Sequence, residues 1–358
     1  MNLAAVAVIA IIATVAFGTA FLAAPILAHF LYRHRCWKKQ ARTQAPDGSG
    51  TPLFHELHKD REVNTPRLGG LLIWVTVGSL ALIVVILDRF FNTPFVEQLN
   101  FVSRSQTWIP LFTLIAASLL GLIDDLVVIS QRGDDRQGGG IRFRHRAALV
   151  AVIGLVGAWW FYSKLGWQTI HLPFIGDWAI GGWYVVLFVV VMLVSFSGSI
   201  IDGLDGLAGG VFATIFAAYA AIAVVQGQYD LAAFCAAVIG ALIAFLWFNI
   251  PPARFYLSET GVLGLTTTLA VLVFLTDTVF IFPIIAFVLI AEIASDVIQL
   301  TSKKFFGRKI FLIAPIHHHF EAKGWPPYKV TMRFWLISGV FSVIGLIIFL
   351  LDQSFAAS

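Results

Sequence analysis

The chain has 358 residues, of which 59% are hydrophobic and 12% are charged, and its formal net charge is +4. Soluble domains average roughly 45–50% apolar and 25% charged residues. This composition therefore excludes an ordinary soluble enzyme and a disordered chain, and two cysteines exclude a disulfide-rich secreted module. It indicates an all-α polytopic membrane protein that forms one domain over residues 1–358.

Long apolar segments follow one another along the whole chain. A membrane-crossing helix needs about 20 mostly apolar residues. The sequence predicts ten transmembrane helices, at residues 3–31, 68–88, 108–123, 147–164, 183–201, 207–227, 230–249, 261–279, 280–300 and 333–351. Asp277 and Pro283 separate the eighth segment from the ninth. The Gly- and Trp-rich loop 165–182 is expected to form a short hairpin.

The loops between these segments differ strongly in positive charge. Of the 24 Lys and Arg residues, 21 lie in the first, third, seventh and ninth loops, and the other three are Arg89, Arg104 and Lys164. Positive charge is retained on the cytoplasmic side of a membrane. We therefore expect the odd-numbered loops in the cytoplasm and both termini outside. Because the basic loops act as topology signals, we expect no nucleic-acid partner.

Two adjacent carboxylates, Asp124 and Asp125, end the third segment. Neighbouring like charges repel each other, and a divalent cation or a cationic substrate group would relieve the repulsion. Acidic residues at a helix C-terminus also oppose the helix dipole. The pair is either a solvated helix end or part of a metal or catalytic site.

The fifth loop carries a second pair of acids, Asp202 and Asp205, within Ser199–Ala208. At a spacing of three residues, these side chains share one face if the segment is helical. Gly203 and Gly206 allow the backbone to approach a ligand closely. A short polar turn is the alternative interpretation, but acids in a cytoplasmic loop without any basic residue favour a functional role.

The seventh loop runs from Asn249 to Gly261 and contains a Pro-Pro turn, Tyr256 and Glu259. Taken alone, this loop is best interpreted as a helix-breaking connector. Glu259 would then lie in the first turn of the next helix, where the helix dipole favours an acid.

Three consecutive histidines, His317, His318 and His319, lie in the ninth loop near Lys323. Successive side chains rarely all point at one ion, and no cysteine joins them, so a zinc site is disfavoured. Histidine can instead donate hydrogen bonds to anionic groups. Carboxylates in the neighbouring loops suit Mg²⁺, which prefers oxygen ligands and substrate phosphates. A phosphate-bearing soluble substrate and a lipid acceptor would fit this surface.

The same loops resemble the polyprenyl-phosphate sugar-phosphate transferases, a glycosyltransferase 4 type family, over nearly the whole chain. The matching segments are Thr65–Gly70 (TPRLGG), Asp124–Asp125, residues 202–208 (DGLDGLA), Asn249 with Pro251–Ala253, and residues 308–325 (RKIFLIAPIHHHFEAKGW). The histidine segment is the most specific match. It resembles the branch that transfers phospho-N-acetylmuramoyl-pentapeptide, rather than the branch that transfers GlcNAc phosphate.

This resemblance implies substrates, a cofactor and a location. It implies transfer of phospho-MurNAc-pentapeptide from UDP-MurNAc-pentapeptide to undecaprenyl phosphate, with Mg²⁺, to give lipid I and UMP for peptidoglycan synthesis. The protein would then be a multi-pass enzyme of the bacterial inner (cytoplasmic) membrane, surrounded by membrane lipid, with its catalytic loops in the cytoplasm. A homodimer is left open.

The resemblance also assigns roles to individual residues. It implies catalytic roles for Asp124, Asp125, Asp202, His317, His318 and His319. It implies metal ligation by Asp202 and Glu259. It implies substrate binding by Lys59, Arg61, Thr65, Ser199, Asp205, Asn249 and Tyr256, with Asp205 at the uridine and Tyr256 stacked on the uracil.

Three positions depart from the family pattern. Glu259 replaces a metal-binding aspartate, Ser199 replaces an asparagine, and Val128 replaces a lysine. We expect Arg142, Arg144 or Arg146 to substitute for that lysine. The alternatives are a GlcNAc-1-phosphate transferase of the same fold and a non-catalytic descendant that binds lipid or nucleotide-sugar. A transporter is disfavoured, because the notable acids cluster at one face.

Overall fold

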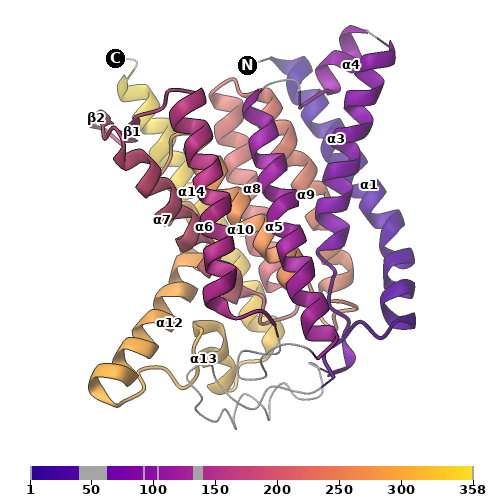
Figure 1. Ribbon diagram of the computed structural model, residues 1–358, viewed down its shortest axis with the longest axis vertical. Coiled ribbons are helices and arrows are strands. Elements are labelled where there is room, and N and C mark those ends of the chain that lie inside the picture. Colours follow the sequence, from indigo (N-terminus) through magenta and orange to yellow (C-terminus); the bar gives the residue numbers. More distant parts are fainter. Residues whose placement is uncertain (1, 40–62, 92, 103–104, 132–139, 357–358) are drawn as a thin grey trace.

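The computed structural model describes residues 2–39, 63–91, 93–102, 105–131 and 140–356, and long helices dominate them (Figure 1). Within these residues, nine helices are long and apolar enough to cross a membrane. They are α1 (Leu3–Arg33), α3 (Leu71–Phe91), α5 (Ser105–Ile129), α6 (Phe143–Trp159) with a π-helical turn (Trp160–Lys164), α7 (Trp183–Ser197) with a 3₁₀ turn (Gly198–Ile201), α8 (Leu207–Val225), α9 (Tyr229–Asn249), α10 (Ser258–Leu275) and α14 (Pro327–Ala356). The prediction of a polytopic helical membrane protein is confirmed.

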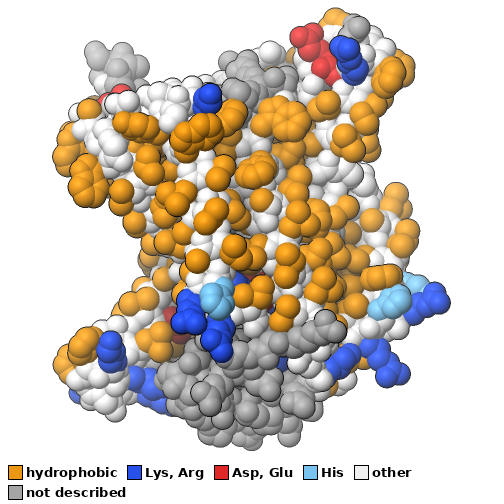
Figure 2. All heavy atoms as spheres, viewed as in Figure 1, with side chains coloured by type: hydrophobic (Ala, Val, Ile, Leu, Met, Phe, Trp, Pro, Cys, Tyr) orange, Lys and Arg blue, Asp and Glu red, His pale blue; other side chains and the backbone are white. Residues whose placement is uncertain are grey.

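The two ends of the bundle differ in structure and in charge. Both chain termini lie at the upper end in Figure 1, together with α4 (Pro94–Leu99) and an antiparallel hairpin of β1 (Thr169–Leu172) and β2 (Gly176–Ala179). The hairpin predicted for residues 165–182 is therefore confirmed. Hydrophobic side chains cover the middle of the visible face, and blue Lys and Arg side chains gather near the lower end (Figure 2). This pattern matches a bundle with an apolar belt and one basic end.

The ninth predicted segment, 280–300, is not one straight helix. The chain forms α11 (Phe282–Ile285), breaks at Ala286, and continues as α12 (Phe287–Phe306), which leaves the bundle at the lower left of Figure 1. The predicted boundaries are wrong, and α12 is not among the nine apolar helices. The physical reason is its amphipathic pattern, because the face that α12 buries includes the polar residues Glu292, Ser295, Gln299 and Ser302.

Helix α10 forms the centre of the molecule, and 17 of its 18 residues are buried. It packs along α5 and also contacts α7. The close contact with α5 depends on Gly121, where a Cβ atom would overlap the carbonyl oxygen of Glu259. Small residues allow membrane helices to approach closely, which increases van der Waals packing. The packing of α5 on α10 therefore brings the Asp124–Asp125 pair beside the first turn of α10.

Candidate active site

The predicted site residues gather at the lower end of the bundle, although they come from distant parts of the sequence. Asp124 and Asp125 lie in the last turns of α5, and Glu259 lies in the first turn of α10. Asp202 and Asp205 lie in the turn between α7 and α8. The histidines lie on α13 (Ile316–Ala322), which packs against the same turn at Gly203.

Asp125 is fully buried, and both of its carboxylate oxygens are occupied. Arg67 donates to Oδ1 from Nε and Nη2, each at 2.8 Å. Ser258 Oγ (2.6 Å), Thr260 N (2.9 Å) and Thr260 Oγ1 (2.5 Å) donate to Oδ2. This carboxylate therefore joins the segment before α3 to α5 and α10. A carboxylate with both oxygens bonded in this way positions its neighbours.

Asp124 has a different set of partners and fewer of them. Its Oδ1 accepts from the backbone N–H of Ile141 at 2.6 Å, and Arg146 Nη1 lies 3.4 Å from Oδ2. The same Nη1 lies 2.5 Å from Oε1 of Glu259. Arg146 thus bridges two carboxylates, and it is one of the three arginines expected to substitute for the family's lysine. The family's lysine position, Val128, is buried and apolar.

Arg67 is a functional candidate that the motifs of the sequence alone do not single out as a site residue. Burial lowers the pKa of its guanidinium, but the carboxylates of Asp125, Glu259 and Asp124 outweigh that effect, so its pKa lies above the usual value. It remains a permanent cation at the acidic cluster. The available signal was its place inside the TPRLGG segment, directly after Pro66.

Asp202 is half-buried at the C-terminal end of the 3₁₀ turn, and its Oδ2 accepts from Ser258 N at 2.7 Å. Burial raises the pKa of this carboxyl group to about 7, while the Ser258 N–H and the charge of Arg67 act to lower it. The nearby charge of Glu259 raises it further. Asp202 therefore lies close to a second carboxylate, where a bound cation would favour its charged form.

Two non-glycine residues at the site adopt the left-handed backbone conformation. Leu68 has φ of 73° and Ser258 has φ of 55°. The N–H of Leu68 donates to Ser258 Oγ at 2.9 Å, and the same hydroxyl donates to Asp125. A positive φ is unfavourable for such residues and persists where surrounding contacts impose it, which is common at functional sites.

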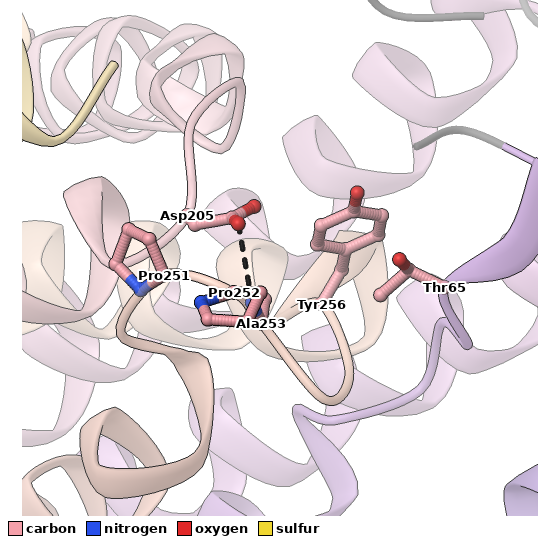
Figure 3. A pocket seen from close by; sticks show the side chains of 6 residues that line it. All are labelled: Thr65, Asp205, Pro251, Pro252, Ala253 and Tyr256. Carbon is pink, nitrogen blue, oxygen red and sulfur yellow. Dashed lines mark hydrogen bonds between the residues drawn. The ribbon is translucent and has the colours of Figure 1, made fainter. Parts of the chain in front are cut away.

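A cavity of about 320 Å³ opens beside Asp205. Its lining residues, which Figure 3 shows, are Thr65, Asp205, Pro251, Pro252, Ala253 and Tyr256. Asp205 Oδ2 accepts from Ala253 N at 3.1 Å, so the turn between α7 and α8 is joined to the loop before α10. An aromatic ring, two prolines and a carboxylate form a surface on which a planar polar ligand can stack.

Asn249 supports this cavity and does not belong to its lining. Its Oδ1 accepts from Gly206 N at 2.9 Å, and its Nδ2 donates to Phe255 O at 2.8 Å. The buried amide thus joins the two loops that form the cavity. Ser199 lies in the 3₁₀ turn, half-buried, and its carbonyl oxygen lies 3.5 Å from Asp202 N.

The three histidines do not point at one place. A Cβ atom on Gly203 would overlap Nε2 of His317 and lie 3.0 Å from Nε2 of His318, so both rings face the Asp202–Asp205 turn. His319 instead accepts from Leu312 N at Nδ1, 3.1 Å away, and its ring lies edge-on to Phe311. The predicted residues Lys59 and Arg61 lie outside the described residues.

The carboxylates can be tested against the predicted Mg²⁺ site. Among the described residues, no three His, Cys, Asp or Glu side chains are placed to hold a metal ion together. Mg²⁺ is usually bound by one or two carboxylates, with waters and substrate phosphates completing its shell. Glu259 Oε2 is buried without a hydrogen-bond partner in the described part of the chain. Glu259 and Asp202 together fit that ligand set.

Comparisons with known proteins identify the family of this chain. The family model described as glycosyl transferase family 4 matches residues 107–277. The chain is similar to the phospho-N-acetylmuramoyl-pentapeptide-transferase of Levilactobacillus brevis, with 35% identity over 82% of this chain and 86% of the relative. Proteins of the same name from Lactiplantibacillus plantarum (34% identity, 82% and 86%) and Geobacillus kaustophilus (32% identity, 80% and 85%) are also similar. The chain therefore belongs to the phospho-N-acetylmuramoyl-pentapeptide-transferase family.

Proposed function

We propose that this chain transfers phospho-MurNAc-pentapeptide from UDP-MurNAc-pentapeptide to undecaprenyl phosphate, giving lipid I and UMP. The observation that carries the proposal is the convergence of Asp124, Asp202, Glu259 and His317 at one end of an apolar bundle, beside the cavity at Tyr256. Membership of the family supports the same substrates. A site at the end of membrane helices can receive one water-soluble and one lipid substrate.

The orientation belongs to the same proposal. We infer that α11 and α12 together make a tenth passage, because both termini lie at one end of the bundle in Figure 1. The basic side chains that gather at the other end indicate that this end faces the cytoplasm (Figure 2). The site would then open at the inner face of the bacterial cytoplasmic membrane, where nucleotide-sugars are available.

The cavity beside Tyr256 is proposed to bind the uridine of the donor. The Tyr256 ring, which lines the cavity, would stack on the uracil, and the carboxylate of Asp205 would accept hydrogen bonds from the nucleoside (Figure 3). Thr65 also lines the cavity and offers a hydroxyl group. Because Asp205 and the Asp202 side chain belong to one short turn, the diphosphate would extend toward Asp202 and Glu259.

Asp202 and Glu259 are proposed to hold Mg²⁺ on the diphosphate. When bound, the ion would neutralise charge on the phosphoryl oxygens and so favour attack at phosphorus. Arg146 limits the motion of the Glu259 side chain through Oε1 and leaves Oε2 without a partner in the described part of the chain. The longer side chain of Glu259 is thus held in place by an arginine that also contacts Asp124.

Asp124 and Asp125 are proposed to have separate roles. Asp125 orders the site, since Arg67, Ser258 and Thr260 occupy both of its oxygens. Asp124 is the carboxylate with fewer partners, and it lies beside Arg146, which can attract the lipid phosphate. A lipid phosphate that arrives as the dianion can attack the sugar-linked phosphorus without losing a proton, and UMP then leaves.

The direct test is release of UMP by the purified protein in detergent. Undecaprenyl phosphate, Mg²⁺ and either UDP-MurNAc-pentapeptide or UDP-GlcNAc are supplied, with and without chelator. We expect release with the first donor alone, and we expect chelator to abolish it. Release with UDP-GlcNAc alone would identify the sister activity. A folded protein that binds the nucleotide-sugar and releases no UMP would be a non-catalytic descendant.

A further inference from the structure

Two histidines of the site are each paired with a glutamate that the proposed mechanism does not use. His317 Nδ1 lies 2.9 Å from Oε2 of Glu292, and both side chains are fully buried. His318 Nδ1 lies 2.6 Å from Oε2 of Glu321, and both are at least nine-tenths buried. The centroids of the two imidazole rings lie 4.0 Å apart, so the two His–Glu pairs form one cluster of four residues.

The pairing determines which ring nitrogen holds the proton. A carboxylate oxygen accepts a hydrogen bond, so the pairing assigns the Nδ1 proton to each histidine. Nε2 is then the atom that can change its partner or its proton. In both rings Nε2 faces Gly203, where a Cβ atom would overlap His317 Nε2 and would lie 3.0 Å from His318 Nε2.

A second observation indicates that His317 is prepared for a ligand. Its Nε2 is buried, and it has no hydrogen-bond partner among the residues that the structure describes. Buried polar atoms are nearly always paired, so an unpaired one calls for an explanation. A group brought by the substrate, next to the Asp202–Asp205 turn, would supply the missing partner.

Helix α12 holds the histidine segment in register through its buried polar face. Ser295 Oγ accepts from Ile316 N at 2.9 Å, one residue before His317. Gln299 contacts the backbone of Ile310 and Phe311 at 2.9–3.0 Å. Glu292, Ser295 and Gln299 thus form a row of polar side chains on α12 that holds α13 against the site. This row explains why α12 is amphipathic.

We propose that Glu292 and Glu321 are positioning residues that hold the proton of His317 and His318 on Nδ1 and direct both Nε2 atoms toward the Asp202–Asp205 turn. The effect of these residues on the reaction rests on the proposed function. With its proton on Nδ1, each ring carries a lone pair on Nε2, which can accept a hydrogen bond from a hydroxyl or N–H group of the bound donor substrate. No bond is formed or broken at either glutamate.

The first test reads the histidine tautomers and needs no activity. The full-length protein, labelled with ¹⁵N-histidine, is compared with Glu321→Ala, and His318→Asn assigns the resonances of His318. We expect wild-type His318 to be protonated at Nδ1, and we expect Glu321→Ala to shift protonation toward Nε2. An unchanged tautomer in Glu321→Ala would overturn the proposal. Glu321→Gln, which keeps an acceptor of similar shape, is the variant to use if Glu321→Ala does not fold.

The second test measures UMP release. Loss of the carboxylate behind a metal-ligating histidine typically costs about 10- to 100-fold. We expect a loss of similar size in kcat for Glu321→Ala, with KM for the donor much less affected. Glu321→Gln should recover part of the rate. The matched control is Asp352→Ala, which removes a buried carboxylate paired with His171 (2.8 Å) at the opposite end of the bundle. Its kcat should equal that of the wild type.

The two tests separate the possible failures. If the wild-type protein releases no UMP while Glu321→Ala changes the tautomer, the proposed function fails and the positioning role stands. If the wild type is active and Glu321→Ala keeps both kcat and the Nδ1 proton, the positioning role is wrong and the proposed function stands. A loss of kcat in Asp352→Ala as large as in Glu321→Ala would also overturn the proposal, since the effect would then be general instability.

Discussion

Asp124 and Asp125 are neighbours in the sequence with different surroundings in the structure. Both are buried, but Asp125 is bonded to Arg67, Ser258 and Thr260, while Asp124 contacts Ile141 and Arg146. Adjacent residues near the end of a helix point in directions about 100° apart. One carboxylate therefore points into the packing of α5 on α10, and the other toward the segment before α6.

This difference predicts opposite effects of the same substitution. Asp125→Asn removes the charge that faces Arg67, and breaking one side of a buried ion pair costs about 3–5 kcal/mol. We expect a clear loss of thermal stability for Asp125→Asn in detergent. Asp124→Asn should melt close to the wild type and lose UMP release by orders of magnitude. Equal melting temperatures for the two variants would contradict the separate roles.

The residue types of the site could be predicted from the sequence, but their pairings could not. The acids and histidines lie in short motifs, so each was visible in the chain alone. Arg67 meets Asp125 across 58 positions, and only the packing of the helices brings them together. Glu321 follows His318 by three residues, but its role depends on the direction of a ring that no spacing determines.

At the scale of elements, the contact between α5 and α10 depends on a residue without a side chain. A Cβ atom at Gly121 would overlap the Glu259 carbonyl oxygen, which is backbone and cannot move away easily. Gly121→Ala should therefore separate the helices and destabilise the protein by about 1–3 kcal/mol, the usual cost of overpacking. UMP release should fall as well, because Glu259 and Asp125 lie at this contact.

The control for Gly121→Ala is Gly78→Ala in α3. There a Cβ atom would meet only Cδ1 of Ile115 at 3.7 Å, which is an ordinary van der Waals distance. Melting curves of the two variants should separate, with Gly78→Ala at or above the wild type, since alanine favours a helix. A Gly121→Ala variant as stable and active as Gly78→Ala would show that α5 and α10 are not in close contact.

The β1–β2 hairpin predicts a dependence on pH. The His171 ring lies between Asp177 (2.7 Å at Nδ1) and Asp352 (2.8 Å at Nε2). The backbone N–H of His171 donates to the carboxylate of Asp277. Burial lowers the pKa of His171, but the hydrogen bonds with both carboxylates raise it more, so the pKa lies above its ordinary value. The charged ring then stabilises the hairpin fully below a pH of about 6.5, the unfolded pKa. This stabilisation is lost as the pH rises through the folded pKa.

Hydrogen exchange of residues 169–179, corrected for the intrinsic effect of pH, measures this loss. Protection should fall as the pH rises, and the fall should be smaller in Asp352→Asn, in which only Asp177 still faces the ring. Asp88→Asn is the control, because Asp88 pairs with Asn100 and no histidine takes part. Protection that is independent of pH in the wild type would contradict the role of His171.

The helical elements were predictable wherever one apolar run matched one helix, as in α8 and α9. The ninth segment was not predictable, because its apolar residues belong to two helices. One face of α12 is polar because it bonds to the backbone of the histidine segment. Ser295 and Gln299 bond the backbone that precedes His317, and that backbone lies 11 to 21 positions further along the chain. A hydropathy pattern does not contain such a contact.

At the scale of the whole molecule, the charge asymmetry predicts a single orientation. Ser354 is exposed near the C-terminus, and Lys309 is exposed at the opposite end. In intact cells, a membrane-impermeant maleimide should label Ser354→Cys, and it should label Lys309→Cys only after permeabilisation. The unmodified protein is the control, since Cys36 and Cys235 are buried. The reverse pattern of labelling would contradict a cytoplasmic site.

The proposed transfer is tested most directly by a product analysis of one reaction. Purified protein is given undecaprenyl phosphate, UDP-MurNAc-pentapeptide and Mg²⁺, and UMP and the extracted lipid are quantified together. We expect one lipid product for each UMP, with a mass equal to the lipid phosphate plus phospho-MurNAc-pentapeptide. UMP without that lipid, or no UMP from a folded protein that binds the donor, would contradict the proposed transfer.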